Sequence, residues 1–232
     1  METLTDDGAL TVALLKGRVF PEARDLLERA GLEGVGLLSD SRRLVWTTEG
    51  GWRYLLVRPH DVVTCVREGV ADVGLVGKDV LLEDSAGVYE VLDLGIGACR
   101  LSVAGPSPGA CGWPEMLAAL GNELRVATRY PRATREYFAR RGYSPYVIQL
   151  SGAVELAPQV GLADVIVDLV ATGRTLRDNH LVEYEVIGEI TARLVVNIVS
   201  FRWKAAAVQA LCDRLARVCS GRKEVHHVLP AP

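Results

Sequence analysis

Short apolar runs alternate with amphipathic stretches over most of this chain. Residues 10–15 (LTVALL) and 163–168 (ADVIVD) are rich in leucine or β-branched residues, which favours buried strands. Residues 131–141 begin with proline and are followed by Gly142, as is typical of a helix. The alternation of strands and helices predicts an α/β fold with mostly parallel sheets. Strands are predicted at residues 10–15, 52–57, 89–94, 100–104, 124–128, 146–150 and 163–168, and helices at residues 21–30, 61–68, 113–120, 131–141 and 204–218.

Two segments divide the chain into a first and a second lobe. Residues 106–113 are rich in turn-forming residues, and we interpret this region as the crossing from the first lobe to the second. Residues 185–200 are apolar and β-branched, and they are long enough for two strands or one bent strand that returns to the first lobe. We therefore expect a discontinuous first lobe of residues 1–98 and 185–232, a second lobe of residues 99–184, and a cleft between them.

Charge and composition argue against several classes of protein. The chain has 26 lysines and arginines against 29 acidic residues, so it offers no broad basic surface for nucleic acid. An anionic ligand must therefore meet local clusters of arginine and lysine. Residues 1–10 lack the basic and apolar regions of a secretory signal, and no apolar run approaches the length of a membrane span. These features favour a cytoplasmic protein.

The cysteines and histidines show no metal-binding pattern. The five cysteines are scattered without a Cys-x-x-Cys pair, so neither a zinc site nor a disulfide framework is expected, and free thiols suit the cytoplasm. His226 and His227 are adjacent, and on a strand they would point to opposite faces. We therefore expect no metal ion held by the protein alone.

The candidate chemistry is concentrated in residues 155–176, ELAPQVGLADVIVDLVATGRTL. Asp168 stands at the carboxyl end of a predicted strand, where ligands of open α/β sheets bind. Small residues after it allow an anion to approach backbone amides, and a helix turn from Leu176 onward would add free N–H groups. We call residues 171–175 the cradle loop; its members are Ala171, Thr172, Gly173, Arg174 and Thr175. The pattern predicts a sugar-phosphate site, although an ordinary capped turn has a similar sequence.

The whole stretch resembles the sequence pattern of the ATP phosphoribosyltransferases, the first enzymes of histidine biosynthesis. In that pattern a glutamate precedes a Gly-x-Ala-Asp segment, a strand ends in aspartate, and Thr-Gly-x-Thr-Leu follows. The matching residues here are Glu155, Gly161, Ala163, Asp164, Asp168, Thr172, Gly173, Thr175 and Leu176. The resemblance covers residues 10 to about 200. It implies a two-lobed α/β fold like that of type II periplasmic binding proteins, with the active site in the cleft between the lobes.

The resemblance also implies an activity. Members of the family transfer the phosphoribosyl group of phosphoribosyl pyrophosphate to N1 of the adenine of ATP and release pyrophosphate. Asp168 and the cradle loop would bind phosphoribosyl pyrophosphate, and Mg²⁺ would be held largely by substrate oxygens. Glu155 would orient the substrates or assist proton loss from the exocyclic amine; as an alternative, it is only a favourable charge at a helix N-terminus.

Arginines that follow predicted strands are the candidates for neutralising the leaving pyrophosphate. Arg18 belongs to a Lys-Gly-Arg turn after the first strand, a sequence that the family pattern shares. Arg43, with Arg42 as the alternative in register, precedes a leucine as in the family, and Arg58 ends the strand at residues 52–57. Cations at these positions would stabilise the charge that develops in the transition state. The alternative is that they are ordinary solvated surface residues.

The predicted ATP contacts lie in the first lobe. Lys16 and Gly17 form the turn after the first strand. Asp72 and Gly74 belong to a Gly-x-x-Asp-x-Gly series that also resembles the family. The chain departs from the family pattern nearby, where Val63 replaces a usual proline, and this affects only the expected start of a helix.

The expected partners follow from the length of the chain and from the resemblance. Longer members of the family carry a C-terminal regulatory domain, for which the residues after the predicted helix 204–218 leave no room. The chain therefore resembles the short form of the family. We expect a homodimer that joins a regulatory subunit similar to histidyl-tRNA synthetase in a larger hetero-oligomer, and neither a nucleic-acid nor a membrane partner.

Two other functions remain as alternatives. A phosphoribosyltransferase of another class has two acids before its Thr-Gly loop, whereas Leu169 replaces the second acid here. A two-lobed small-molecule binding protein or regulatory effector domain would have the same fold. Such a protein would be expected to carry a signal peptide or a DNA-binding segment, and arginines at several strand ends favour an enzyme instead.

Overall fold

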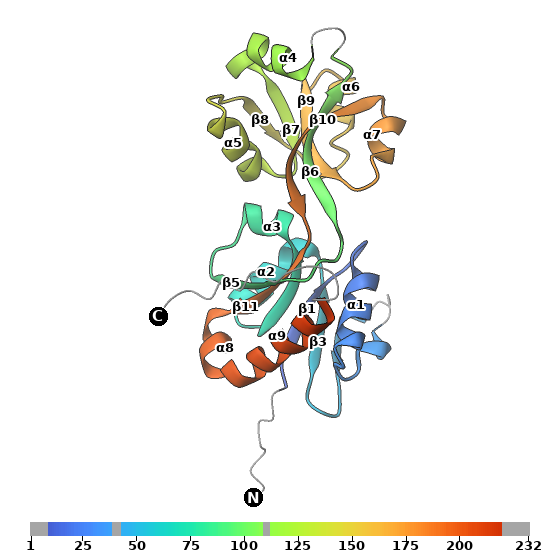
Figure 1. Ribbon diagram of the computed structural model, residues 1–232, viewed down its shortest axis with the longest axis vertical. Helices are drawn as coiled ribbons and strands as arrows, with labels where there is room; N and C mark the ends of the chain where they lie inside the picture. Colours follow the sequence, from blue (N-terminus) through green and yellow to red (C-terminus); the bar gives the residue numbers. More distant parts are fainter. Residues whose placement is uncertain (1–8, 39–42, 109–111, 220–232) are drawn as a thin grey trace, which may run out of the picture. The chain divides into compact units, whose positions relative to one another are not determined.

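The computed structural model describes residues 9–38, 43–108 and 112–219, and the chain divides into two compact units (Figure 1). The first unit is formed by residues 1–97 together with residues 191–232, and the second unit is formed by the residues between them. The chain therefore leaves the first unit once and returns to it once. Arg42, Cys111, His226 and His227, which the sequence analysis considered, lie outside the described residues.

The return to the first unit comes later in the chain than residue 185, where the sequence analysis placed it. Strand β10 (Leu181–Ile190) belongs wholly to the second unit, and the returning segment begins at Thr191. The apolar run that predicts the return continues through both β10 and β11 (Ala192–Asn197). Its composition therefore does not mark the residue at which the chain passes from one unit to the other.

The first unit is built on a six-stranded sheet with the strand order β2-β3-β1-β4-β11-β5. Strand β1 lies near the centre and pairs in parallel with β3 on one side and β4 on the other. The edge strands β2 and β5 and the returning strand β11 pair antiparallel with their neighbours. The bounds of the strands not yet given are β1 (Thr11–Leu15), β2 (Val45–Thr47), β3 (Arg53–Val57), β4 (Val73–Gly77) and β5 (Val88–Asp93).

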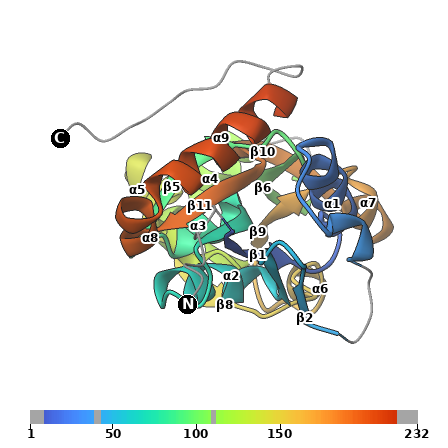
Figure 2. The same ribbon diagram turned by 90° about the horizontal axis from the view of Figure 1, so that it is seen from below.

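Helices cover both faces of this sheet, and Figure 2 shows α9 and α2 on opposite sides of it. Pro21 and Pro59 stand in the first turns of α1 and α2, where a missing N–H breaks no helical hydrogen bond. The helices of the unit are α1 (Phe20–Arg29), α2 (Pro59–Arg67), α3 (Lys78–Glu83), α8 (Ile198–Trp203) and α9 (Ala205–Cys219), with the 3₁₀ turn η1 (Val35–Leu37). Within the described ranges, no helix is both long enough and apolar enough to cross a lipid bilayer.

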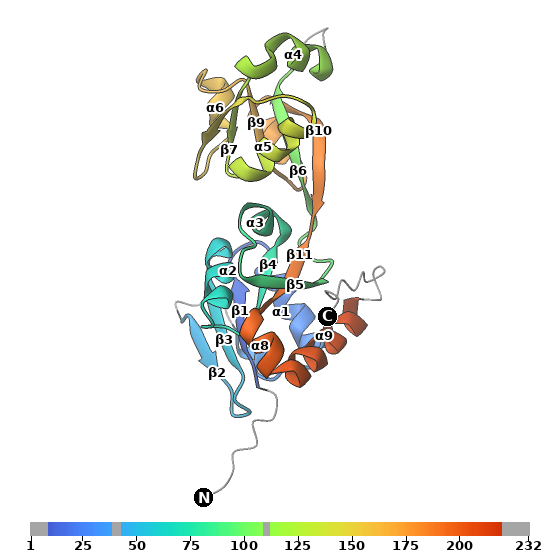
Figure 3. The same ribbon diagram turned by 90° about the vertical axis from the view of Figure 1, so that its left-hand side faces the viewer.

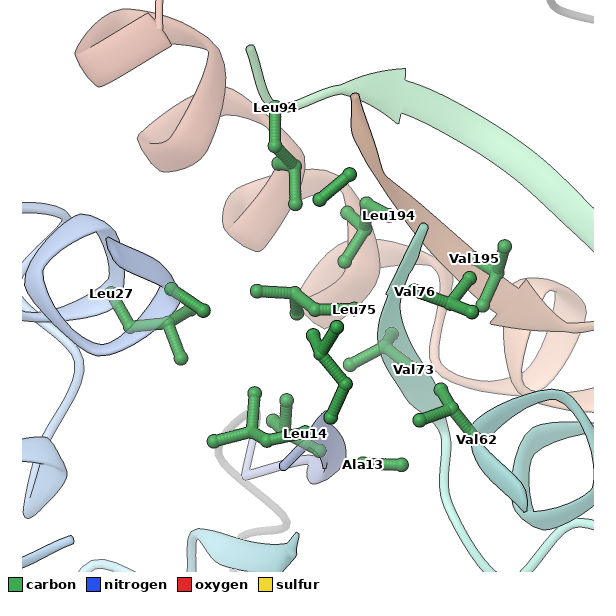
Figure 4. Close-up of a cluster of buried hydrophobic side chains, with 14 of the residues drawn as sticks. Ala13, Leu14, Leu27, Val62, Val73, Leu75, Val76, Leu94, Leu194 and Val195 are labelled. Carbon is green, nitrogen blue, oxygen red and sulfur yellow. The ribbon is translucent and has the colours of Figure 1, made fainter. Parts of the chain in front are cut away.

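The core of the first unit follows from the alternation of side chains along β1, β4 and β11. Leu14, Leu75 and Leu194 are in register and point to the face that Leu27 of α1 covers (Figure 4). Their neighbours in sequence point to the opposite face, where Val62 of α2 packs. Each fully buried leucine of this kind contributes about 1.5–3 kcal/mol through the hydrophobic effect. The central strands are therefore buried on both faces, and their sequences are apolar throughout.

The second unit has a five-stranded sheet with the order β10-β6-β9-β7-β8. Figure 3 labels its strands β10, β6, β9 and β7. Helices α5 and α7 lie on opposite sides of its strands (Figure 1). The remaining strands are β6 (Cys99–Pro106), β7 (Arg125–Thr128), β8 (Tyr146–Gln149) and β9 (Val165–Val170). The helices are α4 (Trp113–Leu120), α5 (Pro131–Arg140), α6 (Leu156–Gln159) and α7 (Arg174–Asp178), with the 3₁₀ turn η2 (Gly121–Glu123).

Both sheets are mixed, which corrects the prediction that they are mostly parallel. Among the described strands, parallel pairing is confined to β1 with β3 and β4, and to β7 with β8 and β9. Strand β6 brings the chain into the second unit and β10 takes it out in the opposite direction, so these two strands pair antiparallel. The apolar character of a buried strand does not reveal its direction, and the sequence pattern therefore could not distinguish the two arrangements.

Candidate functional site

The parallel strands of the first unit place their carboxyl ends at one edge of the sheet. The turn from Lys16 to Arg18 follows β1, and Arg58 follows β3. The backbone N–H of Lys16 donates a hydrogen bond of 2.8 Å to the carbonyl of Val57. This bond fixes the start of the β1–α1 turn beside the end of β3. The predicted residues Lys16, Gly17, Arg18 and Arg58 therefore lie at the same edge.

The β1–α1 turn presents Arg18 to solvent. Gly17 has a φ of +102°, a backbone conformation that a residue with a side chain rarely adopts. Arg18 is exposed, and its Nη2 donates a hydrogen bond of 3.0 Å to the carbonyl of Gly97. Arg58 is also exposed, and no residue that the structure describes forms a hydrogen bond or ion pair with its guanidinium. The guanidinium of Arg58 and the remaining N–H donors of Arg18 are thus open to an anion.

Arg43 reaches the same edge from the neighbouring strand. The N–H of Leu56 donates a hydrogen bond of 2.8 Å to the carbonyl of Leu44, so the antiparallel register places residue 43 opposite the end of β3. The Nε of Arg43 donates to the carbonyl of Val45 at 2.8 Å. The Arg43 guanidinium lies 5.7 Å from the centre of the Trp46 ring. The three arginines that the sequence analysis selected therefore lie at the same edge of the first sheet.

Asp72 lies at the opposite, amino edge of the sheet. It is 8% exposed, and its Oδ2 accepts a hydrogen bond of 2.8 Å from the N–H of Thr11, the first residue of β1. Its Oδ1 accepts a bond of 2.6 Å from the hydroxyl of Ser200, and the Nζ of Lys204 lies 3.0 Å from Oδ2. The carboxylate thus joins β1 to α8 and to the start of α9. The predicted ATP contact does not fit this position, because Asp72 is separated from the exposed arginines by the length of the strands.

Gly74 was also predicted to contact ATP, but the structure shows it as a packing residue. It is the second residue of β4 (Val73–Gly77) and lies under α2. An added Cβ would stand 2.7 Å from Cγ1 of Val62 and 2.8 Å from Cγ2 of Val66, closer than carbon atoms can approach. The glycine therefore lets α2 pack closely against the sheet. The shared Gly-x-x-Asp-x-Gly series is explained here by packing and by buried hydrogen bonds.

In the second unit, Asp168 is not the last residue of its strand. Strand β9 continues to Val170 because β6 stays paired with it, whereas the pairing of β7 with β9 ends where Thr128 meets Val167. Asp168 is thus the first residue of β9 beyond the β7 ladder. It lies opposite Ser102 in register, and its Oδ1 accepts a hydrogen bond of 2.8 Å from the N–H of Leu169.

The cradle loop follows β9 and is exposed over most of its length. Gly173 has a φ of +71° and immediately precedes α7, which begins at Arg174 rather than at the predicted Leu176. Thr172 accepts a hydrogen bond of 3.4 Å from the N–H of Arg174 through its hydroxyl. The first N–H groups of a helix have no partner within the helix, so the following amides, beginning at Thr175, are available to a ligand. The loop therefore has the glycine, the hydroxyls and the amides of the expected cradle.

Arg174 and Glu155 are less tightly placed. Arg174 forms an exposed ion pair of 3.5 Å with Asp178, which contributes little to stability. Glu155 is half-buried at the start of α6, and its side chain makes no capping hydrogen bond there. It follows β8, whose carboxyl end lies at the same edge as that of β9 because β7, β8 and β9 are mutually parallel. Glu155, Asp168 and the cradle loop thus share one edge of the second sheet.

The sequence analysis missed the side chains that hold the base of the cradle loop. Arg100 of β6 donates through Nε and Nη2 to the carboxylate of Glu183, at 2.6 and 2.5 Å. Its Nη1 donates to the carbonyl of Ala171 at 3.3 Å. The hydrogen bond to Arg100 lowers the pKa of Glu183, and the same bond raises the pKa of Arg100. Glu183 is far from Arg100 along the chain, so the sequence does not indicate that they pair. The only signal is the presence of an arginine inside an apolar strand.

The family model described as HisG, ATP phosphoribosyltransferase, matches residues 58–217. This chain belongs to that family. The match includes the cradle loop and the strands on either side of it.

Curated relatives agree over nearly the whole chain. An ATP phosphoribosyltransferase of Bacillus licheniformis is 49% identical over 215 residues, which cover 92% of this chain and 97% of the relative. The ATP phosphoribosyltransferase of Bacillus subtilis is 46% identical over 214 residues, covering 91% of this chain and 96% of the relative. The relatives are therefore of similar length to this chain, as the short form of the family is.

Solved structures agree with the same fold. The ATP phosphoribosyl transferase (HisG:HisZ) complex from Thermotoga maritima contains a chain that is 34% identical, with a TM-score of 0.74 and coverage of 91% of this chain and 99% of that one. The alkanesulfonate-binding protein SsuA from Xanthomonas axonopodis pv. citri has a TM-score of 0.57 at 15% identity, covering 91% of this chain and 73% of that one. The second likeness shows the fold alone and confirms the predicted periplasmic-binding-protein-like class.

Membership of the ATP phosphoribosyltransferase family establishes the reaction. The chain is a pentosyltransferase that condenses ATP with phosphoribosyl pyrophosphate to N1-phosphoribosyl-ATP and pyrophosphate, the first step of histidine biosynthesis. The alternatives of a binding protein and of a different phosphoribosyltransferase are thereby set aside. Among the described residues, no group of three or more histidines, cysteines and acids could hold a metal ion.

Proposed function

We propose that the cradle loop binds the 5′-phosphate of phosphoribosyl pyrophosphate and that Asp168 accepts hydrogen bonds from the ribose hydroxyls. The observation that carries this proposal is the exposed loop after β9, in which Gly173 adopts a left-handed conformation directly before a helix. The hydroxyls of Thr172 and Thr175 and the first amides of α7 are the donors for phosphate oxygens. A sugar phosphate held at both ends places its C1 atom in a fixed position for attack.

The arginines of the first unit are proposed to act on the leaving group. The bond between C1 and the pyrophosphate oxygen breaks as the lone pair of adenine N1 forms the new C–N bond, so negative charge grows on pyrophosphate. Arg18, Arg43 and Arg58 would neutralise this charge, and their shared position at one sheet edge supports a common role. Mg²⁺ would enter as part of the substrate, bound by pyrophosphate oxygens.

Fewer residues are proposed to contact ATP than the sequence analysis predicted. Lys16 and Gly17 keep a proposed role in binding ATP phosphates, because they lie beside the arginines at the carboxyl edge. Asp72 and Gly74 are withdrawn from this role. Glu155 is proposed to orient the adenine or to accept the proton that the exocyclic amine loses after attack; its half-buried carboxylate makes no capping bond that would explain it otherwise.

The role of the cradle loop can be tested with two glycine variants that carry the same backbone strain. Gly173 has a φ of +71° and Gly142, after α5, has a φ of +82°; beyond its own helix backbone and chain neighbours, an added Cβ at Gly142 would meet no atom within 4 Å. Gly173→Ala should weaken binding of phosphoribosyl pyrophosphate, measured by calorimetry, on the order of tenfold or more. Gly142→Ala should lower stability to a similar extent and leave binding unchanged. Equal binding by both variants would contradict the proposal.

We also propose that this chain forms a homodimer and joins a HisZ-like regulatory subunit in a hetero-oligomer in the cytoplasm. The likeness to a chain of the Thermotoga maritima HisG:HisZ complex supports the partner. The free thiols of Cys65 and Cys212, which form no disulfide within the described part of the chain, support the location. Activity and its inhibition by histidine should be measured for the purified chain, with and without the partner. Full activity with histidine inhibition from this chain alone would contradict the proposal.

A further inference from the structure

A charged pair closes the base of the connection between β9 and β10, which contains the cradle loop and α7. Arg100 forms two hydrogen bonds to Glu183, at 2.6 and 2.5 Å, and a third to the carbonyl of Ala171 at 3.3 Å. The hydroxyl of Ser102 donates a further bond of 2.6 Å to Glu183. Ala171 is the first residue of the connection, and Glu183 lies just beyond its last. One guanidinium therefore links both ends of the segment that carries the cradle loop.

The strand register places this pair on the same face of the sheet as the proposed sugar contact. Arg100 and Ser102 alternate along β6, so their side chains share one face. Ser102 lies directly opposite Asp168 of β9, and residues directly opposite each other in a ladder also share a face. The ion pair, the Ser102 hydroxyl and Asp168 therefore form one polar strip that leads to the cradle loop.

Apart from the bond from Arg100, the start of the cradle loop is held by α7, where Nη1 of Arg177 donates a hydrogen bond of 3.2 Å to the carbonyl of Thr172. The residues of the loop are largely exposed, and Gly173 gives its backbone freedom that other residues lack. A ligand gains affinity when the loop that binds it is already ordered, because less conformational entropy is lost on binding. A guanidinium held by a bidentate carboxylate is an effective way to fix a backbone carbonyl, since its planar donors have a set geometry.

We propose that Arg100 and Glu183 are positioning residues for phosphoribosyl pyrophosphate: Glu183 orients the guanidinium of Arg100, which fixes the carbonyl of Ala171 and so sets the direction of the cradle amides. This inference rests on the proposed function of the cradle loop. Lysine at position 100 keeps the charge but loses the fork of donors, and it cannot bond Glu183 twice and Ala171 together. Glutamine at position 183 keeps the shape but removes the charge that holds the fork.

The other end of β9 provides a matched control. Arg125 of β7 bonds the carboxylate of Asp164, with a shortest distance of 2.7 Å, and its Nη1 donates to the carbonyl of Gly161 at 2.8 Å. This second pair has the same set of bonds, one carboxylate and one loop carbonyl. It lies at the amino end of β9, whereas the cradle loop follows the carboxyl end. Arg125→Lys should therefore lower the stability of the protein as Arg100→Lys does, but it should not alter the proposed sugar-phosphate site.

The test compares Arg100→Lys, Glu183→Gln and Arg125→Lys in steady-state assays of the complete chain, with its regulatory partner present if activity requires it. Arg100→Lys and Glu183→Gln should raise KM for phosphoribosyl pyrophosphate at least about tenfold, with KM for ATP changed less than about twofold. Arg125→Lys should lower the melting temperature by a similar amount to Arg100→Lys and change neither KM. A fall in kcat without a change in the affinity for phosphoribosyl pyrophosphate would overturn a positioning role.

Asp168→Asn and Gly173→Ala separate failure of this inference from failure of the proposed function. If these two variants weaken the use of phosphoribosyl pyrophosphate while Arg100→Lys and Glu183→Gln do not, the inference is wrong and the site stands. If none of the four variants weakens the use of phosphoribosyl pyrophosphate, the cradle loop is not its binding site, and both the inference and the proposed function are wrong. Equal increases in both KM values for Arg100→Lys and for the Arg125→Lys control would show a general structural effect, and would also overturn the inference.

Discussion

The two units use similar-looking sequence motifs in opposite ways. In the first unit, Asp72 and Gly74 are buried, and their partners come from β1, α2, α8 and the start of α9. In the second unit, Asp168 precedes the exposed cradle loop at the carboxyl edge of the sheet, and Gly173 belongs to that loop. Both motifs combine an acid with glycine. The difference shows that the partner and the sheet edge, rather than the residue types, separate a packing motif from a binding motif.

The strongest test of this difference is Asp72→Ala. Removal of the carboxylate leaves the N–H of Thr11 and the hydroxyl of Ser200 without their partner and separates Lys204 from its counter-charge. The free energy of unfolding, measured with urea, should fall by about 3 kcal/mol. The affinity of the folded variant for ATP should not change. A loss of ATP affinity with unchanged stability would return Asp72 to the site.

Arginines at the two ends of β3 test the importance of the sheet edge. Arg58→Ala should lower kcat about 100-fold, equivalent to about 2.7 kcal/mol. The variant lacks a positive charge at the carboxyl edge that would stabilise the transition state. Arg53 is also exposed, but it begins β3 at the amino edge. Arg53→Ala is therefore the control and should leave turnover unchanged. Similar losses from both variants would mean that the edge does not matter.

Asp168→Asn tests the binding motif directly. Loss of a charge-assisted hydrogen bond to a sugar hydroxyl should weaken the use of phosphoribosyl pyrophosphate by on the order of 1.5–3 kcal/mol, measured as kcat/KM. The circular dichroism spectrum and melting temperature serve as controls for the fold. Unchanged kinetics would remove Asp168 from the site.

Gly74→Ala tests the packing motif. The new Cβ would overlap Val62 and Val66, and the displacement of α2 should cost about 1.5 kcal/mol of stability. Gly188 of β10 is the control, because an added Cβ there would meet no atom within 4 Å. Urea unfolding of Gly188→Ala should show a smaller loss. If Gly74→Ala instead altered KM for ATP at full stability, the packing explanation would be wrong.

The smallest expected effect concerns acid stability in the second unit. The hydrogen bond from Arg100 lowers the pKa of Glu183 in the folded state, so its contribution to stability is present above the unfolded pKa. That contribution is lost as the pH falls through the folded pKa, which lies below the ordinary pKa of a glutamate carboxyl. Glu183→Gln should therefore be less stable than the natural protein at pH 7, by at most about 1 kcal/mol, and the difference should shrink in acid. A difference that grows in acid would contradict this.

The sequence predicted most strands because they are apolar runs, but it did not predict the central strand β4 (Val73–Gly77), whose apolar residues are interspersed with glycines. The run at residues 10–15 became β1, and the run at residues 52–57 became β3. Strand direction and the exact end of β9 could not be predicted, since both depend on which neighbour continues the ladder. Asp168 lies at the predicted position, but β6 extends the strand past it to Val170.

The candidate site was predictable only where its residues are consecutive in sequence. The cradle loop and the Lys16–Arg18 turn could be selected as candidates because each is a continuous segment after a strand. The structural role of Asp72 was hidden because Ser200 and Lys204 are remote in sequence and meet it only after folding. The pairing of Arg100 with Glu183 was hidden for the same reason.

The position of β11 in the first sheet has a consequence for the order of events on the ribosome. Strand β11 (Ala192–Asn197) lies between β4 and β5, and it is the only described strand that pairs with β5. The nascent chain exposes β5 long before β11 has been translated, whereas the second unit is contiguous and can complete its sheet first. During synthesis, β5 therefore has no strand partner, and the apolar strand β4 presents an open sheet edge of the kind that recruits chaperones or other chains.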